Sequence, residues 1–169
     1  GNSPDCACIE IRAVGPKLAV RYGRVRVALA GEHSATLRRN DGSSLTVPAW
    51  TSLTLEPDDV LEIGFLKSGT AYLAVAGGID SPLDLGSRST YQRAMIGGID
   101  GHPIMKGNLL HCAAQAHRES REYRGAPWRY ADEPVRVMLG PQDGHFKPES
   151  VRQFLDSDWR KYDRPRSRS

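Results

Sequence analysis

"KLAVRYGRVRVAL", residues 17–29, decides the fold class. Polar and apolar residues alternate on both sides of a break at Tyr22 and Gly23. Alternation with a period of two gives a strand one buried face and one exposed face, whereas a helix repeats its apolar residues every three or four positions. The stretch therefore predicts two strands, over residues 17–20 and 24–29.

The same pattern continues outward on both sides of this stretch. Further short strands are expected at residues 10–12, 34–37, 51–55, 60–65 and 70–76. The last of these is the most apolar, and we expect it to be central. A hairpin turn is expected at Asn40-Asp41-Gly42, because these residues tolerate positive φ. Strands at intervals of about ten residues predict an all-β barrel or sandwich.

The second half of the chain carries a weaker pattern. One helix is expected at residues 148–155, where a proline near the first turn suits a helix start. Three apolar residues at helical spacing would form its buried face, namely Val151, Phe154 and Leu155. A strand is expected before it at residues 134–139, and residues 118–129 are expected to form a polar, exposed connection.

Charge and composition exclude several classes of protein. Of the 169 residues, 39% are hydrophobic and 25% are charged, which is typical of a globular protein and not of a disordered one. The net charge is +3, but the last ten residues hold five Lys or Arg against one Asp, so the other 159 sum to −1. We interpret these last ten residues as a solvated end of the chain. The alternative is an arm that binds phosphate groups. Neither a nucleic-acid partner nor a membrane is expected, since cations do not spread over one face and no apolar run reaches about 20 residues.

The cysteines and histidines do not predict a metal centre. Three cysteines at irregular spacing make a poor disulfide framework, so we expect reduced thiols in the cytoplasm. These cysteines are Cys6, Cys8 and Cys112. A metal shared by them and His111 is a minor alternative, because the spacing differs from that of zinc sites. The remaining histidines of interest, His102, His117 and His145, are scattered.

A repeated tetrapeptide marks the candidate site. Gly-Gly-Ile-Asp occurs at residues 77–80 and again at 97–100, and the 16 residues between them, 81–96, are mostly polar. Paired glycines allow a sharp turn or the close approach of a ligand. These glycines are Gly77, Gly78, Gly97 and Gly98.

The segment between the two copies is rich in hydrogen-bond donors. Its central residues are Ser87, Arg88, Ser89 and Thr90. Hydroxyl and guanidinium groups suit an anionic or carbonyl-bearing ligand, and no nucleophile–base pair accompanies them. Two other interpretations stay open: the tetrapeptide is a recurrent turn, and Arg88 pairs with Asp80 or Asp84 as a structural clamp.

A longer stretch carries a resemblance to a known family. "YLAVAGGIDSPLDLGSRSTYQRAMIGG", residues 72–98, closely resembles the signature of the biotin-dependent carboxyltransferase family. That family includes the carboxyltransferase region of urea amidolyase (urea carboxylase), allophanate hydrolase subunit 2 and a subunit of bacterial 5-oxoprolinase. Three flanking stretches agree with it: "GNSPDCACIEI" at 1–11, "ALAGEHSATL" at 28–37 and "VRVMLGPQDGHFKPESVRQFL" at 135–155. The resemblance covers essentially the whole chain.

The resemblance implies a fold and a division of the chain. It implies a mainly β, cyclophilin-like barrel lobe with few short helices, as a fragment of a two-lobed protein with its site in the cleft. Residues 1–133 would form the carboxyltransferase-like lobe without its N-terminal part. Residues 134–169 would form a strand, a short helix and a truncated connection to the second lobe.

The resemblance also implies chemistry. Carboxybiotin on a separate carrier would deliver its carboxyl group to a small urea, amide or lactam, and ATP would be bound by a partner subunit or domain. The implied catalytic residues are Arg88, Ser87, Ser89 and Thr90. The implied substrate-binding residues are Gly77, Gly78, Gly97, Gly98, Gln142 and Asp143.

Two features qualify this expectation. His33 and Asn108 stand where the family commonly has Asp, which changes local charge and hydrogen bonding.

The expected partner is a sister subunit of an amidolyase or 5-oxoprolinase complex. The alternative function is that of a non-catalytic regulatory partner, of the type that antagonises a histidine-kinase inhibitor.

Overall fold

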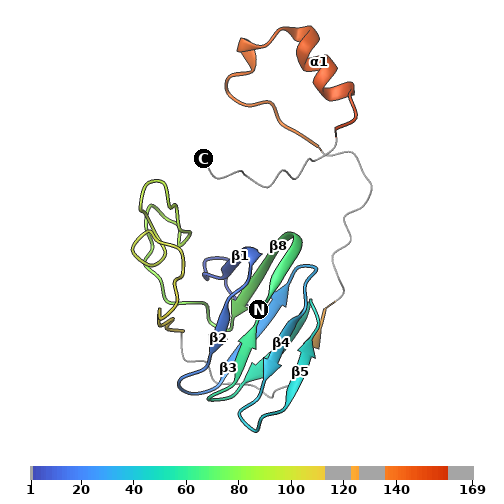
Figure 1. Ribbon diagram of the computed structural model, residues 1–169. Coiled ribbons are helices and arrows are strands. Elements are labelled where there is room, and N and C mark those ends of the chain that lie inside the picture. The colour runs from blue at the N-terminus through green and yellow to red at the C-terminus, as the bar shows by residue number, and fades with distance from the viewer. Residues whose placement is uncertain (1, 113–122, 126–135, 160–169) are drawn as a thin grey trace. The chain divides into compact units, whose positions relative to one another are not determined.

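The computed structural model describes residues 2–112, 123–125 and 136–159. The chain divides into two compact units, Gly1–Trp128 and Arg129–Ser169. The first unit is mainly β, as the sequence predicts, and its two antiparallel sheets curl into a half-barrel (Figure 1). The division expected between residues 133 and 134 stays a prediction.

The larger sheet has five strands in the order β1-β8-β3-β6-β9. Its strands are β1 (Ile9–Val14), β3 (Val25–Ala30), β6 (Thr51–Leu55), β8 (Phe65–Val75) and β9 (Tyr123–Arg124). The strand expected to be central is β8, which lies inside the sheet between β1 and β3. It pairs Leu73 with both Ile9 and Leu29, so three apolar side chains meet across the sheet.

The smaller sheet has four strands in the order β2-β7-β4-β5. Its strands are β2 (Lys17–Ala19), β4 (Ala35–Arg38), β5 (Ser44–Val47) and β7 (Val60–Glu62). The predicted hairpin turn is confirmed, since β4 and β5 pair on either side of it and Gly42 has a φ of 85°. At such a φ a glycine avoids the steric cost that a side chain would bring.

Alternating burial along the strands builds the core. In β6 the side chains alternate between buried and half-buried positions, beginning and ending buried. Leu37, Leu61 and Leu73 from three different strands are each no more than 1% exposed. Full burial of a leucine side chain stabilises a fold by about 1.5–3 kcal/mol, so these aliphatic residues provide the main stabilisation of the half-barrel.

One carboxylate is buried in the half-barrel. Asp59, 1% exposed, accepts hydrogen bonds from Arg39 Nη1 at 2.7 Å, from the Glu56 amide at 2.9 Å and from the Asn40 amide at 3.2 Å. Three donors, one of them charged, compensate for the loss of water around the buried charge. Asp59 thereby joins the turn before β7 to the hairpin that follows β4.

The second unit contains a short 3₁₀ helix, η1 (Asp143–His145), and the helix α1 (Pro148–Asp156). The helix occurs where the sequence predicts it, with proline in its first turn. The prediction that α1 buries one face is wrong, because no residue of α1 is buried. Phe154 and Leu155 are 46% and 53% exposed. Within the second unit the Phe154 ring contacts the Trp159 ring, with the two ring centroids 5.3 Å apart.

Two further expectations in the second half need correction. The prediction of a strand at residues 134–139 is wrong for the described residues 136–139, because these residues form no β-strand. The connection expected at residues 118–129 contains the short strand β9, which pairs with β6. Two residues are too few to give a recognisable alternation. Residues 118–122 and 126–129 of that connection lie outside the described residues, as does His117.

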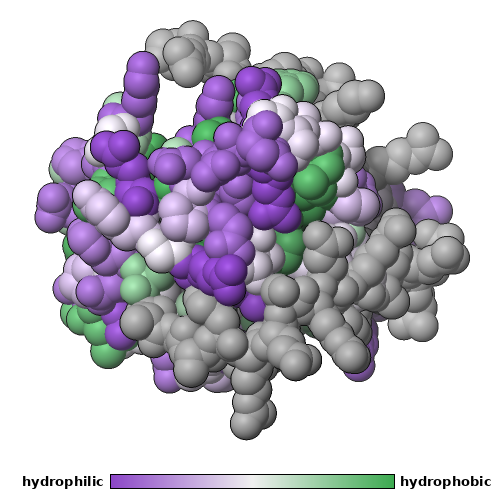
Figure 2. All heavy atoms as spheres, turned by 90° about the horizontal axis from the view of Figure 1, so that it is seen from below, coloured by the Kyte–Doolittle hydropathy of each residue, from purple (hydrophilic) through white to green (hydrophobic). Residues whose placement is uncertain are grey.

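Two observations concern the surface and the helices. On the face drawn in Figure 2, hydrophilic residues dominate, and hydrophobic residues are exposed in separate patches. No helix in the described part of the chain has the length and apolar character needed to cross a bilayer.

Candidate functional site

The first Gly-Gly-Ile-Asp turn leaves the end of β8 and is held by two other segments. Ile79 forms isolated β-bridges with Ala7 on one side and Cys112 on the other. Asn2 binds the start of the turn with both ends of its amide: Nδ2 donates to the Val75 carbonyl at 2.7 Å, and Oδ1 accepts from the Gly77 amide at 2.9 Å. The start of the long loop is therefore fixed by the chain's first residues.

The backbone amides of this turn are already hydrogen-bonded. Besides the Gly77 amide, that of Gly78 donates to Val75 at 2.8 Å, that of Ile79 to Ala7 at 3.3 Å and that of Asp80 to His111 at 2.8 Å. These four N–H groups are committed to protein carbonyls or to Asn2. The turn thus does not offer free amides to a ligand.

The glycines instead serve the turn itself. Gly77 and Gly78 have φ values of 81° and 83°, a conformation in which other residues are strained. A Cβ at Gly78 would lie 2.9 Å from the Cβ of Cys6. The Cys6 thiol also donates to the Gly77 carbonyl at 3.5 Å. Close packing on Cys6 explains why the second glycine has no side chain.

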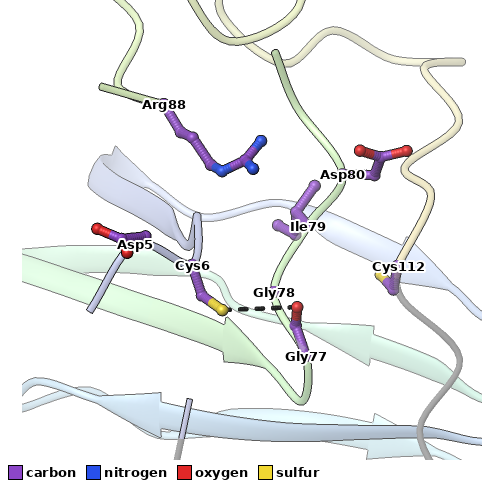
Figure 3. A pocket seen from close by; sticks show the side chains of 8 residues that line it. All are labelled: Asp5, Cys6, Gly77, Gly78, Ile79, Asp80, Arg88 and Cys112. Atoms are coloured by element: carbon purple, nitrogen blue, oxygen red, sulfur yellow. Dashed lines mark hydrogen bonds between the residues drawn. The ribbon is translucent and has the colours of Figure 1, made fainter. Parts of the chain in front are cut away.

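A cavity of about 430 Å³ opens beside this turn (Figure 3). Its lining residues are Asp5, Cys6, Gly77, Gly78, Ile79, Asp80, Arg88 and Cys112. In Figure 3 Cys6 and Asp5 lie to one side of the 77–80 segment, and Cys112 and Asp80 lie to the other. The cavity therefore brings together three stretches that are far apart in the sequence.

Arg88 supplies a cation to this cavity. Its side chain reaches over the turn in Figure 3, and one guanidinium nitrogen, Nη1, donates to the Ser81 carbonyl. The residue is half-buried and lines the cavity. A guanidinium has five N–H donors, so the bond to Ser81 fixes its position and leaves donors for a ligand. Among the described residues no ion pair joins Arg88 to Asp80 or Asp84.

The three predicted hydroxyl residues lie elsewhere. Ser87, Ser89 and Thr90 are exposed and do not line the cavity. Ser87 Oγ accepts from the Ser89 amide at 3.1 Å, and the backbones of Ser87 and Asp84 exchange two hydrogen bonds. These contacts shape the loop locally.

The second Gly-Gly-Ile-Asp turn closes the loop upon itself. A Cβ at Gly97 would lie 2.1 Å from the Ser89 carbonyl oxygen, and one at Gly98 would lie 1.9 Å from Thr90 Oγ1. The Gly97 amide donates to Asp84 Oδ2 at 3.0 Å, so Asp84 does act as a clamp, with a backbone amide as its partner. Neither glycine lines the cavity.

The remaining predicted residues belong to other parts of the chain. Gln142 and Asp143 lie in the second unit, where Asp143 Oδ1 accepts from the Gly144 amide at 2.8 Å. His33 is half-buried between β3 and β4. Asn108 Oδ1 accepts from the Met105 amide at 2.6 Å, which closes a local turn. An Asp at position 108 would keep such an acceptor.

Most of the residues that line the cavity were not predicted from the sequence. Asp5 and Asp80 were not predicted to meet Cys6 and Cys112, although a metal shared by the cysteines was a minor alternative. Long-range contacts bring these residues together: the two β-bridges of Ile79, the bond of the Cys6 thiol to Gly77 and that of the Asp80 amide to His111. Ser81 was missed too: it is buried, and its hydroxyl has no hydrogen-bond partner among the described residues. Burial raises the pKa of the Cys112 thiol, and that of Cys8 rises through burial and the nearby Glu10 carboxylate. In the described part of the chain no cluster of ligating side chains suits a metal ion.

Known proteins resemble the chain along most of its length. A family model described as the carboxyltransferase domain, subdomain A and B, matches residues 1–164. The chain is 29% identical to urea amidolyase of Saccharomyces cerevisiae over 177 aligned positions, which cover 95% of this chain and 9% of that protein. It is 36% identical to a 5-oxoprolinase subunit of Escherichia coli over 89 positions, which cover 53% of this chain and 28% of that protein.

A solved structure of a related enzyme is also similar to the chain. The crystal structure of the Kluyveromyces lactis urea carboxylase matches with a TM-score of 0.59 and 32% identity, over 66% of this chain and 10% of that chain. The chain spans about a tenth of the length of the urea amidolyase and urea carboxylase relatives.

Proposed function

Because the chain belongs to the family of carboxyltransferase domains with subdomains A and B, we propose that it is the carboxyltransferase-type part of a larger biotin-dependent enzyme. Its substrate class is a small urea, amide or lactam. The observation that carries this proposal is the half-buried Arg88 guanidinium, held by the Ser81 carbonyl at the wall of a 430 Å³ cavity. We place the enzyme in the cytoplasm, where the free cysteines would stay reduced.

The cavity suits a carboxylated ureido group. A planar guanidinium matches the two oxygens of a carboxylate, and the bond to Ser81 holds it in position before a ligand arrives. Gly77 and Gly78 form a wall without side chains, against which a flat group can lie. When bound, carboxybiotin from a separate carrier supplies the carboxyl group. ATP would be used by another domain or subunit.

The residues of this chain contribute by position and charge. Arg88 binds the carboxylate and stabilises negative charge that develops on it or on a neighbouring carbonyl oxygen. Since the amides of residues 77–80 are engaged within the protein, Arg88 is the donor that we assign to the ligand. The carboxylates of Asp5 and Asp80 at the same cavity repel a second anion and favour a neutral or N–H-bearing substrate.

Covalent catalysis by the Cys112 thiol is disfavoured. Burial raises the pKa of Cys112, so this thiol stays protonated at neutral pH and is a poor nucleophile. This agrees with direct transfer of the carboxyl group between two bound molecules.

The test is substrate-dependent ATP hydrolysis by the chain together with its biotin-carboxylase and carrier partners. Urea and 5-oxoproline are tested as substrates. We expect Arg88→Ala to lower kcat by about 10²–10³-fold, the effect of removing one preorganised donor. Arg93→Ala is the matched control, because Arg93 is exposed in the same loop and does not line the cavity. An unchanged rate for Arg88→Ala would contradict the proposed site.

A second candidate is the regulatory partner that binds a sister subunit without catalysis. It is favoured by large apolar side chains that the loop exposes: Leu83, Leu85, Tyr91, Met95, Ile104, Met105 and Leu109. Exposed apolar groups of this kind mark protein contacts. Replacement of Leu85 and Met105 by Ser would abolish assembly in this case, whereas Arg88→Ala would leave both assembly and regulation unchanged.

A further inference from the structure

A second hollow lies next to the candidate cavity. It is a groove of about 1010 Å³ at the mouth of the half-barrel, and Ile79 and Cys112 line both it and the candidate cavity. We call it the mouth groove. It lies within residues 2–112 of the first unit and plays no part in the function proposed above.

The floor of the mouth groove is made of core side chains. Four strands contribute to it at the end of the half-barrel, through Ile9, Val27, Leu55, Leu73 and Val75. Each of these residues is less than 9% exposed, so each adds a small apolar area to the floor. Such a floor favours apolar side chains over a fully polar ligand.

The rim of the mouth groove is cationic. Lys17, Arg21, Arg24 and Arg26 line it, and no Asp or Glu is among the lining residues of this fully described part of the chain. Arg24 binds Glu56, which lies outside the lining, and Arg26 binds the hydroxyls of Ser52 and Thr54. Lys17 and Arg21 are exposed on the β2 side. The rim therefore favours negative charge.

One wall of the mouth groove is an open strand edge. In the described part of the chain, β2 pairs with β7 on one side and with no strand on the other. The Ile63 amide donates to Pro16, and the Val20 amide donates to Asp59. Since backbone hydrogen bonds alternate along an antiparallel strand, the amides of Lys17 and Ala19 point away from β7.

We propose that the mouth groove binds an extended peptide segment of a partner protein, with alternating acidic and apolar residues, as an added strand at the β2 edge. The open edge supplies main-chain hydrogen bonds. Every second side chain of the peptide faces the apolar floor, and the others meet Lys17 and Arg21. A small anionic amphiphile would use the floor and the rim but leave the strand edge unpaired.

The test uses the full chain and a fluorescein-labelled peptide of about nine residues that alternates Glu and Val. Anisotropy titration is expected to show binding that weakens as NaCl rises from about 50 to about 500 mM. A peptide alternating Lys and Val is expected not to bind. Equal binding of both peptides, or of neither, would overturn the proposal.

Two variants separate the contributions. Ala19→Pro removes one outward amide and is expected to weaken binding roughly two- to tenfold, while Ala19→Ser keeps the amide and the affinity. Lys17→Glu with Arg21→Glu is expected to weaken binding at least tenfold, while Arg152→Glu in the second unit has no effect. Affinities unchanged by both groove variants would place the peptide elsewhere.

Two other occupants give distinct results. If decanoate displaces the peptide from the wild-type chain and binds as tightly to Ala19→Pro, the occupant is a small anion and the strand-addition proposal is wrong. If sedimentation shows a dimer that the Lys17→Glu, Arg21→Glu variant dissociates, the groove binds a second copy, which also overturns it.

Discussion

The two sheets and the loop at residues 80–112 are held together in different ways. In the sheets, aliphatic side chains from facing strands meet in a continuous core, in which Leu37, Leu61 and Leu73 are almost fully buried. The loop exposes most of its large apolar side chains and is held by backbone hydrogen bonds and by glycines packed closely against other residues of the loop. The sheets thus derive their stability from burial, whereas the loop derives its shape from a few polar contacts and from the absence of side chains. The site that we propose lies at the loop, an arrangement that is common for binding loops on a rigid scaffold.

The largest effect is expected in the sheet region, at Asp59. Asp59→Ala leaves Arg39 beside a buried space without its carboxylate and is expected to lower the free energy of unfolding by about 3–5 kcal/mol. Urea denaturation followed by circular dichroism measures it. Glu62→Ala is the control, because its ion pair with Arg38 is exposed and contributes about 0–1 kcal/mol. Similar losses for both variants would show that burial does not distinguish the two pairs.

A smaller and local effect is expected in the loop. Gly98→Ala forces a Cβ against Thr90 Oγ1 at a φ of 59°, and its cost is expected to be about 1–3 kcal/mol. Gly86→Ala is the matched control, because Gly86 has a φ of 77° but nothing within 4 Å of its Cβ position. Tryptic cleavage after Arg88 or Arg93 reports the opening of the loop. We expect faster cleavage in Gly98→Ala than in Gly86→Ala, and equal rates would mean that the second turn does not close the loop.

The smallest effect concerns a thiol at the junction of the two regions. Burial raises the pKa of Cys112, so less of it is thiolate at any pH below that value. With Cys6 and Cys8 replaced by Ser, its alkylation by iodoacetamide at about pH 8.5 should be slower than that of glutathione and should keep rising at higher pH. Mass spectrometry of the alkylated fraction measures the rate. A reaction as fast as that of glutathione would show that Cys112 is not shielded.

The sheets could be predicted from the sequence because their signals are local. Alternation over Lys17–Ala19 and Val25–Ala30 and the turn residues before Gly42 are visible in short windows, and the structure confirms strands there. The helix α1 was also predicted, but its buried face was not, because amphipathic spacing shows which face is apolar and not whether anything covers it. Two-residue β9 carries no periodic signal, so its pairing with β6 could not be predicted.

The candidate site was predicted only in part. Repetition of Gly-Gly-Ile-Asp indicated the two turns, and Arg88 lines a cavity beside the first of them. Residues 77–80 of that turn line it too, but Asp5, Cys6 and Cys112 come from stretches that long-range contacts join to the turn, which no local pattern reveals. The glycines were interpreted as openings for a ligand, but at Gly78, Gly97 and Gly98 the space is filled by Cys6, Ser89 and Thr90. A glycine motif indicates close approach without telling whether the approaching atoms belong to a ligand or to the protein.

The central claim is that Arg88, and not the amides of the first turn, contacts the ligand. Nuclear magnetic resonance tests it directly, through the Arg88 Nε–H signal assigned by its loss in Arg88→Lys. On titration with 5-oxoproline, whose carboxylate serves as the probe, we expect this signal to shift and saturate. The amides of residues 77–80 should keep their slow hydrogen exchange throughout, because they stay bonded to protein acceptors. A saturating shift of those amides with an unmoved Arg88 signal would contradict the account.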